Sequence, residues 1–417
     1  MKLDSLKPLL HHDGPLTTVC LDVTRGDESS GDREVRNRWN GMRRSLEQAG
    51  APAESIAVIE EVVLRPTHVA GPQGRYVVAA QGRVLWDQVL PEPPVRDEAF
   101  HDGAPSLVPA VAALDEAVRY LLVEVDRLGA DLRWSGVAER AEDGGEGAEP
   151  DRGHGRVEHV EGGHDVLHKF GGGGWSHRRF QARVQDSWER NAEAVAAELD
   201  KVVAEQRPEL VLITGDVRAL PLVRAAVGHA VAELLVEVPG GSRADGVKGD
   251  VFAQRVGDIL EQYRARRREA VVERLRESLG RGEGAVTSLD DLVEVLRKGQ
   301  VAELVVLRTA GGASVARLNE RRLWTGPEPL QLGTRRADLA ALGVPDGAAR
   351  ELRADVAVLR AVVAQDAGFT YAEEGSVDLV DGVGALLRWS DAATPHETAP
   401  SYTADRYRKG HHRAAGG

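Results

Sequence analysis

Apolar positions recur along the chain at the strand period and at the helix period, and they divide it into three segments. In the first segment, apolar runs at 16–23 and 56–64 predict strands, and apolar positions three and four apart over 33–49 predict a helix. Gln81-Gly82 lies between two further apolar runs and predicts a hairpin turn. The proline-rich stretch 91–109 predicts a connector, because proline cannot donate a hydrogen bond to a sheet. With hairpin strands at 75–80 and 83–90, this segment predicts an α/β domain over residues 1–115.

The middle segment, residues 116–242, has the order strand, helix, strand that is typical of an α/β layer. Between Ser176, a candidate helix cap, and Pro208, apolar residues recur mostly at three- and four-residue steps and predict one long amphipathic helix. An acidic, glycine-rich stretch precedes it at 138–163 and predicts a loop or insertion. The apolar stripe comprises Phe180, Val184, Trp188, Val195, Leu199 and Val202. The other predicted elements are helices at 111–119 and 217–229 and strands at 120–127, 130–134, 210–215 and 234–240.

The third segment, residues 247–390, follows a hydrophilic linker and again mixes both periods. Ser288 and Asp291 are spaced as a capping box, which predicts the start of a helix. Residues 391–417 lack apolar periodicity and predict a disordered basic tail. The predicted elements are helices at 250–279, 288–298 and 348–365 and strands at 302–307 and 383–389. The fold class expected is α/β, with three mixed α/β domains in a line, in a monomer.

Composition places the chain among soluble globular proteins. Hydrophobic residues make up 42% and charged residues 29% of the sequence, and no apolar run is long enough to span a bilayer. The N-terminal sequence lacks the apolar core of a signal peptide. Cys20 is the only cysteine, which excludes an intramolecular disulfide and fits a reducing cytoplasm. We therefore expect a cytoplasmic protein with no membrane partner.

Residues 168–183, HKFGGGGWSHRRFQAR, stand out against the net charge of −13. Four glycines run into Trp175 and the long predicted helix, and no acidic residue lies between Val166 and Gln185. A basic, glycine-rich tip on an acidic protein favours contact with a polyanion. The alternative is an ordinary glycine-rich surface loop with solvated charges.

Patterns of conventional enzyme sites are missing from the sequence. The four glycines are not followed by the Gly-Lys-Ser/Thr of a phosphate-binding loop, and there is no G-x-S-x-G or H-E-x-x-H motif. Four histidines spaced five, five and four residues apart suggest a metal site only weakly, since they lie in an acidic loop without a fixed helix register. They are His154, His159, His164 and His168. We therefore expect no cofactor and no metal.

The order of these parts resembles the bacterial, actinobacterial-type branch of the archaeo-eukaryotic peptide-release-factor superfamily, which also contains Pelota and the hibernation factor Balon. The resemblance covers roughly residues 10–390. It rests on YLLVEVDRLGADLRW (120–134), on GGWSHRRFQ (173–181), which is similar to the family's Gly-Gly-Gln loop, and on DGVGALLRW (381–389). It implies a release-factor/Pelota-like fold whose first domain faces the decoding centre, whose second reaches the peptidyl-transferase centre and whose third docks a translational GTPase.

One departure from the family concerns Trp175, which stands where peptide-releasing members have a water-positioning glutamine. An indole has one N–H donor and no acceptor, so it cannot orient water as an amide does, but it can stack on a base. The structural alternative for Trp175 is packing within its own domain. The RNA-binding residues implied, with no catalytic residue among them, are Lys169, Gly171, Gly172, Gly173, Gly174, Trp175, Ser176, His177, Arg178, Arg179, Gln181 and Arg183.

Three functions follow as hypotheses. The first is a ribosome-binding factor that occupies the A site, contacts rRNA and acts in hibernation or stress protection, with elongation factor Tu on its third domain. The second is a peptidyl-tRNA hydrolase for release or rescue that uses Gln181 or His177. The third is a stress-linked adaptor that has left the ribosome.

Overall fold

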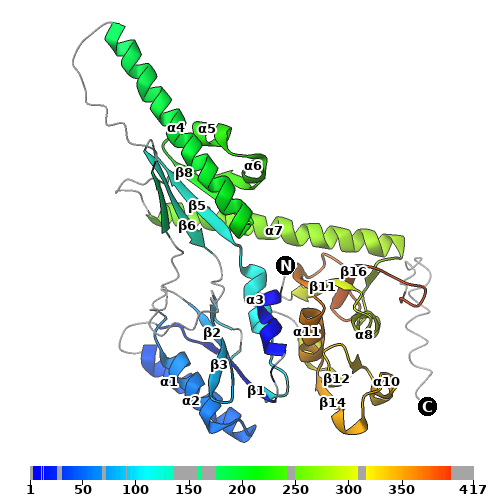
Figure 1. Cartoon of the computed structure of the whole chain (residues 1–417). Coiled ribbons are helices and arrows are strands. Elements are labelled where there is room, and N and C mark those ends of the chain that lie inside the picture. The colour runs from blue at the N-terminus through cyan, green and yellow to red at the C-terminus, as the bar shows by residue number, and fades with distance from the viewer. Residues whose placement is uncertain are drawn as a thin grey trace. The chain divides into compact units, whose positions relative to one another are not determined.

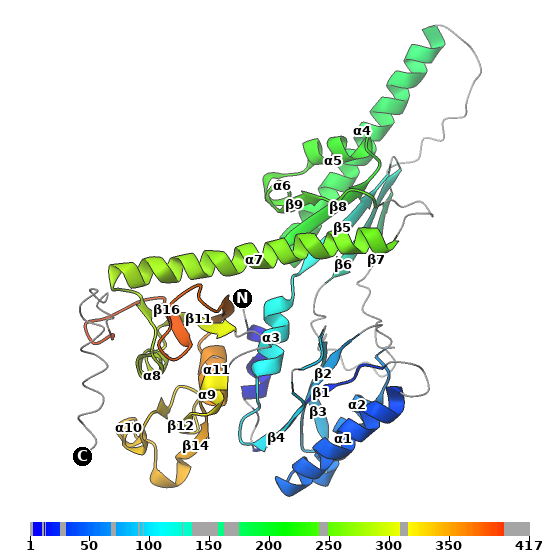
Figure 2. The same cartoon turned by 180° about the vertical axis from the view of Figure 1, so that it is seen from behind.

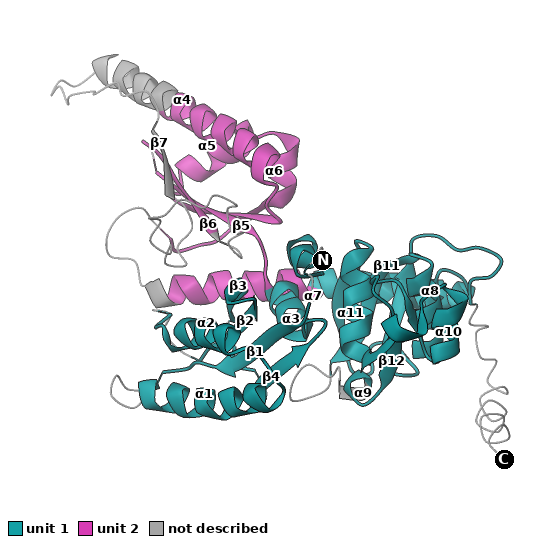
Figure 3. Cartoon of the chain, turned by 60° about the horizontal axis from the view of Figure 1, so that its bottom comes forward, with its two compact units in different colours: residues 1–116, 266–417 teal, residues 117–265 magenta. Residues whose placement is uncertain are grey.

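The computed structural model describes residues 3–10, 12, 14–25, 31–67, 72–90, 92–94, 96–126, 128–135, 157–161, 175–241, 249–308 and 316–395 (Figure 1). Side chains are described for these residues except 135, 157–161, 175–187, 249–250 and 316–317. The chain forms two compact units (Figure 3): unit 1 holds the chain up to residue 116 and from residue 266 onward, and unit 2 holds residues 117–265. The three predicted domains stay a prediction.

The first part of unit 1 is an antiparallel sheet in the order β3-β2-β1-β4. Its strands are β1 (Leu16–Asp22), β2 (Gly74–Ala80), β3 (Arg83–Leu90) and β4 (Glu98–Asp102). Helices α1 (Gly31–Gln48) and α2 (Ala53–Leu64) pack on one face, where Val19 and Leu21 are buried, while Leu16 and Cys20 are buried on the other. Because both faces are covered, β1 is apolar throughout instead of alternating.

Two predictions for this part are wrong. The apolar run 56–64 is helix α2, because Ile56, Ile59 and Val63 lie at helical spacing and are buried together against the sheet. The stretch 91–109 is not only a connector, since its proline-free portion forms β4 and pairs with β1. The predicted hairpin is confirmed, and Gln81 and Gly82 take the positive φ values of 50° and 69° that a tight turn requires.

The second part of unit 1 is a sheet in the order β10-β16-β11-β15 and a small sheet in the order β13-β12-β14. The strands are β10 (Ala285–Val286), β11 (Val301–Arg308), β12 (Arg322–Thr325), β13 (Leu332–Gly333), β14 (Arg350–Arg353), β15 (Gly368–Glu373) and β16 (Val383–Leu387). The helices are α8 (Leu289–Arg297), α9 (Ala316–Asn319), α10 (Arg336–Ala341) and α11 (Ala354–Ala364), with the 3₁₀ turn η2 (Asp346–Ala348). The predicted cap is confirmed: the Ser288 hydroxyl accepts the N–H of Asp291 at 3.1 Å.

The two parts of unit 1 share one hydrophobic core. The N-terminal 3₁₀ helix η1 (Asp4–Leu10) and helix α3 (Val108–Glu116) contribute Leu6 and Val111, which are buried with Leu296 and Val358 from the second part. Ion pairs add to this packing, since the Arg353 guanidinium contacts Glu98 at 2.5 Å. Unit 1 is therefore built from both ends of the chain.

Unit 2 is a five-stranded sheet in the order β7-β6-β5-β8-β9. Its strands are β5 (Tyr120–Val125), β6 (Gly129–Ser135), β7 (Val157–Glu161), β8 (Leu210–Gly215) and β9 (Leu235–Glu237), and its helices are α4 (Trp175–Gln206), α5 (Ala219–Ala226) and α6 (His229–Leu234). Helix α4 packs on one face, against Val211 and Ile213, and the first half of α7 (Gly249–Arg281) packs on the other, against Leu210 and Leu212 (Figures 1 and 2). The sheet is therefore buried on both sides.

Three predictions for unit 2 need correction. The acidic stretch 138–163 is not entirely a loop, because residues 157–161 form β7 and pair with the edge of β6. The helix expected at 217–229 is two helices, since Gly228 adopts an extended conformation and caps α6. Ser176 is the second residue of α4 rather than the residue before it.

One prediction for unit 1 also needs correction. The helix expected at 348–365 begins only at Ala354, because residues 350–353 pair with β12 as β14.

Candidate nucleic-acid interface

The carboxyl ends of three strands of unit 2 lie at one edge of its sheet. Strands β5 and β8 are parallel and aligned, with Val125 opposite Gly215. Strand β7 ends at the same edge, because Glu161 is paired with Gly129 next to the end of β5. We call this the carboxyl edge. Such an edge is where open α/β sheets commonly bind ligands.

Backbone geometry fixes the carboxyl edge tightly. Gly215 has φ +133°, and a Cβ there would come within 1.9 Å of the Val125 carbonyl oxygen, so only glycine fits. The close approach lets the Asp216 N–H donate to that carbonyl at 2.9 Å. The Asp216 carboxylate then accepts the N–H of Arg218 at 2.7 Å, and Asp126 accepts the N–H of Leu128 at 2.7 Å in the neighbouring turn. The two turns are therefore held by their own side chains.

Helix α4 has a packed part and a part that continues past the carboxyl edge. Trp188, Ala192 and Val195 line a small pocket with Val125, at the end of β5, while the last residue of α4, Gln206, lies just before the start of β8. The helix therefore runs toward the carboxyl edge in the direction of its N-terminus. Residues 175–187 precede the packed part and amount to about 20 Å of helix at 1.5 Å per residue.

The register of α4 separates the predicted RNA-binding positions into two groups. Val195, Leu199 and Val202 are buried in a packed stripe, and at about 100° per residue positions 180, 184 and 188 fall on the same side of the helix. At about 100° per residue, positions 175, 178, 179 and 183 centre roughly 180° away from this stripe. Positions 177 and 181 fall on the side of the stripe. The tryptophan and the three arginines therefore occupy positions on one side of the helix.

The structure thus covers the predicted site only in part. Lys169 and the glycines Gly171, Gly172, Gly173 and Gly174 lie outside the described residues. Residues 175–183, which hold Trp175, Ser176, His177, Arg178, Arg179, Gln181 and Arg183, are helical in α4, and their side chains are not described. The contacts of these residues with RNA stay a prediction. Among the described residues there is no group of three or more histidine, cysteine or acidic side chains placed to hold a metal ion.

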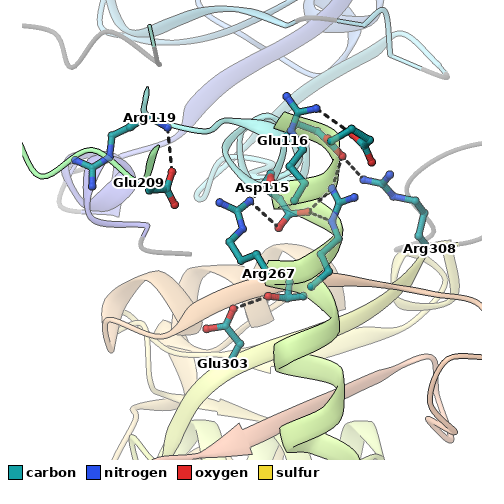
Figure 4. A network of polar contacts seen from close by, with 11 residues as sticks. Asp115, Glu116, Arg119, Glu209, Arg267, Glu303 and Arg308 are labelled. Atoms are coloured by element: carbon teal, nitrogen blue, oxygen red, sulfur yellow. Dashed lines mark hydrogen bonds and ion pairs between the residues drawn. The ribbon is translucent and has the colours of Figure 1, made fainter. Parts of the chain in front are cut away.

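Sequence reasoning missed a cluster of five charged residues in unit 1, the junction cluster: Asp115, Glu116, Arg267, Arg268 and Arg308 (Figure 4). The Asp115 carboxylate is 1% exposed and accepts two hydrogen bonds from Arg268, at 3.0 and 3.2 Å. The Glu116 carboxylate contacts Arg268 at 2.5 Å and Arg308 at 2.6 Å. Arg267 donates to the main-chain carbonyl of Asp115.

Burial and the neighbouring arginines shift the pKa values of the two carboxylates in opposite directions, and a different effect dominates for each. Burial raises the pKa of Asp115 above its ordinary value, and the neighbouring arginines only partly offset it. Burial also acts to raise the pKa of Glu116, but the hydrogen bonds and charges of Arg308 and Arg268 outweigh it and lower the pKa overall. The only signal in the sequence was the basic run RARRR (264–268), which does not name its partners.

Comparison with known proteins finds a family that resembles the middle of the chain. Residues 119–281 match the family model of the bacterial archaeo-eukaryotic release factor family 2, a range that runs from just before β5 to the end of α7. This part of the chain is similar to that family. Two of the three stretches that carried the resemblance, 120–134 and 173–181, lie inside this match. The predicted family resemblance and the mixed α/β class are confirmed.

Two further proteins are similar to the chain along most of its length. The uncharacterized proteins Rv2629 and MT2704 of two Mycobacterium tuberculosis strains (ATCC 25618 / H37Rv and CDC 1551 / Oshkosh) are each 26% identical to it over 397 residues, 94% of this chain and 97% of theirs. Among solved structures, Archaeoglobus fulgidus Pelota is 12% identical, with a TM-score of 0.32 over 76% of this chain and 80% of its own. Saccharomyces cerevisiae Dom34, a translation termination-like factor interacting with Hbs1, is 8% identical, with a TM-score of 0.35 over 78% and 81%. None of the helices that the structure describes is both long and apolar enough to cross a membrane.

Proposed function

We propose that this protein is a ribosome-binding translation factor of the cytoplasm that occupies the A site without releasing the nascent peptide. In this role it blocks the site on idle ribosomes during stress or hibernation. The tip of unit 2, formed by the glycines and the start of α4, contacts rRNA. The C-terminal part of unit 1 binds a translational GTPase, with elongation factor Tu as the candidate.

The observation that carries the proposal is the register of α4. Position 175 and the arginine positions 178, 179 and 183 lie on the side of the helix away from its packed stripe, and they lie on the stretch past the carboxyl edge. An aromatic side chain with arginines around it suits a single-stranded or exposed nucleotide, because the indole stacks and guanidinium groups pair with phosphates. The same register argues against packing of Trp175 on the sheet of unit 2.

The register also argues against hydrolysis by a substitute glutamine. Gln181 is six residues after Trp175 on the same helix, which places it roughly 120° around the axis and about 9 Å along it. It therefore does not take over the place of the family's water-positioning glutamine. His177 lies about 160° from position 175 and is equally displaced.

The second candidate, a peptidyl-tRNA hydrolase in release or rescue, is favoured by Gly173 and Gly174 and by the family match itself. A third possibility is an adaptor that no longer binds ribosomes. It would have the same fold as the other two candidates, so the fold does not distinguish it from them. Two assays separate the three: co-sedimentation with purified ribosomes, and release of labelled peptide from ribosome-bound peptidyl-tRNA.

We expect the purified protein to sediment with ribosomes, more strongly in the presence of elongation factor Tu, and to release no peptide. Peptide release at a rate above the background with ribosomes alone would establish the hydrolase. Failure to sediment under low salt, with or without the GTPase, would leave the adaptor. A variant in which Trp175→Gln is the single change tests the chemistry separately, since trace release would show that the loop is otherwise competent.

A further inference from the structure

Arg360 of helix α11 carries a positive charge in the interior of unit 1. The residue is only 7% exposed, and its guanidinium donates hydrogen bonds to the main-chain carbonyls of Gly326, at 3.2 Å, and Pro327, in the loop that follows β12. Within the described part of the chain, no carboxylate forms an ion pair with it. Burial and the positive charge of Arg350 lower the pKa of Arg360 to about 10, and the negative charge of Glu328 offsets this shift only in part. Folded proteins usually pair a buried charge, so the counter-charge of Arg360 needs an explanation.

Arg350 of strand β14 is a second cation close to the first. It is paired in register with Thr325 of β12, which directly precedes Gly326, the residue that accepts a hydrogen bond from Arg360. Leu352, two residues after Arg350, is buried in the core that includes α11. Because side chains alternate along a strand, Arg350 lies on the same side of the small sheet as Leu352, the side that faces α11 (Figure 1). The two guanidinium groups thus come from a strand and from the helix that packs on it.

The guanidinium of Arg350 is only partly satisfied. It donates to the main-chain carbonyl of Gly103 at 3.0 Å, while its Nε is buried and has no hydrogen-bond partner among the described residues. Gly103 permits this close approach, since a Cβ there would lie 1.6 Å from Nη1 of Arg350. Arg353 on the same strand differs, because its guanidinium contacts Asp355 at 2.6 Å and Glu98 at 2.5 Å. Strand β14 therefore holds one arginine with two carboxylate partners and one with none in the described part of the chain.

We propose that Arg350 and Arg360 form a binding site for a dianionic phosphate group. Guanidinium groups present N–H donors in a plane that matches phosphate oxygens, and such charge-assisted hydrogen bonds are strong. A phosphate monoester carries about 1.5 to 2 negative charges at pH 7, which matches two guanidinium groups better than the single charge of a carboxylate does. The unpartnered Nε of Arg350 donates to one of the phosphate oxygens. This site goes beyond the proposed function, because all of its residues belong to unit 1 and none belongs to the tip of unit 2.

Two small ligands share this chemistry, inorganic phosphate and the terminal phosphate of a small metabolite. Arg360 is recessed, so a phosphate group with a free end reaches it best. A phosphodiester of RNA carries one charge and is substituted on both sides, and it therefore fits this site less well. The experiment distinguishes the two small ligands.

Isothermal titration of the full chain with inorganic phosphate, and separately with adenosine monophosphate, tests the site at constant ionic strength. Arg350→Gln and Arg360→Gln each remove one guanidinium group. The matched control is Arg322→Gln, which removes an exposed arginine of β12 on the other side of the small sheet, where Arg353 is its register partner. Thermal unfolding with and without phosphate is a second measurement that also serves for a less stable variant, because a bound ligand raises the midpoint of unfolding. In the parent protein, phosphate should slow hydrogen exchange at residues 326–328 and 350–360.

We expect phosphate to bind the parent protein, about tenfold more weakly to Arg350→Gln and to Arg360→Gln, and with unchanged affinity to Arg322→Gln. Adenosine monophosphate binding as tightly as inorganic phosphate would assign the site to the terminal phosphate of a metabolite, and binding of inorganic phosphate alone would assign it to the free anion. If the parent protein binds neither ligand, or if the control loses as much affinity as Arg350→Gln, the proposal is overturned. These measurements need no ribosome, so their outcome is independent of the proposed function.

Discussion

Two helical segments of this protein are rich in arginine, and they differ in what surrounds them. The first is 178–183 at the start of α4, where no acidic residue lies between Val166 and Gln185. The second is 264–268 in α7, where Arg264 contacts Glu261 and both Arg267 and Arg268 contact Asp115. By local composition the second segment is the more basic of the two, yet in the folded protein acidic side chains pair with its arginines.

The second segment shows that a basic run does not by itself indicate a polyanion partner, because its charges can be matched within the fold. Asp115 lies 153 residues before Arg268, so no window of the sequence shows them as partners. The first segment has no acidic residue in its own sequence and its positions face away from the packed stripe of α4. The two segments therefore predict opposite results: loss of stability on changing the second, and loss of binding on changing the first.

The largest effect is expected from Arg268→Ala. It leaves the buried Asp115 carboxylate without its two hydrogen bonds, and such a loss costs about 3–5 kcal/mol of the free energy of unfolding. Chemical denaturation followed by the fluorescence of unit 1 measures it. Arg266→Ala, an exposed neighbour on the same helix, is the control and should cost little. Equal stability of the two variants would mean that the junction cluster does not hold unit 1 together.

The next effect is expected from changing Arg178, Arg179 and Arg183 together to alanine. If the three side chains pair with phosphates, ribosome affinity falls by about 100-fold and the slope of log affinity against log salt falls by roughly 2–3. The free energy of unfolding should not change. The control removes the same charge from exposed positions of unit 2, with Arg119, Lys201 and Arg224 changed to alanine. The comparison between the two segments fails if this control flattens the salt slope as much as the triple variant.

A smaller effect is expected from Trp175→Ala. Loss of base stacking should weaken ribosome binding by about tenfold, equivalent to ~1.4 kcal/mol, with an unchanged salt slope because no charge is removed. Trp389→Ala removes a half-exposed tryptophan from unit 1 and should leave binding intact. Should Trp175→Ala lose stability instead of affinity, Trp175 is a packing residue and the arginines alone carry the contact.

The smallest effect is the pH dependence of the ion pair between Glu116 and Arg308. The pKa of Glu116 is lowered in the folded protein. The ionised carboxylate therefore stabilises unit 1 fully at pH values above the ordinary glutamate pKa of about 4.5, and this contribution is lost as the pH falls through the lower pKa of the folded protein. The difference in free energy of unfolding between the parent and Glu116→Gln, about 1 kcal/mol at pH 7, should therefore shrink as the pH falls through the folded pKa of Glu116. Glu277→Gln, an exposed change on α7, provides the baseline. A difference that grows on acidification would reverse the assigned sign.

Local patterns predicted those elements whose cause is local. The Gln81-Gly82 turn, the Ser288 cap and the part of the α4 stripe at Val195, Leu199 and Val202 each depend on residues close in the sequence, and the structure has them as expected. Helix α2 was predicted as a strand because its run 56–64 is apolar on more than one side, and only the sheet beneath it decides which side is buried.

The tip of unit 2 and the junction cluster also differ in whether the local sequence could predict them. The tip of unit 2 was predicted from consecutive residues, and α4 begins at Trp175, earlier than the predicted Ser176 cap implies. The junction cluster depends on two crossings of the chain between units, which no periodicity encodes. The sharing of a core between η1 and α11 was missed for the same reason.

Because unit 1 is assembled from both ends of the chain, it is the last part of the protein to be completed during translation. Unit 2 is one continuous stretch and can fold as soon as residue 265 has emerged. Leu6 and Leu9 of η1, in contrast, are buried with Val358 and Val362 of α11, which are synthesised some 350 residues later. At 5–20 residues per second, this leaves the N-terminal apolar residues without their partners for roughly 20–70 s. The order of synthesis thus gives a nascent-chain chaperone a defined window in which to bind the N-terminal segment.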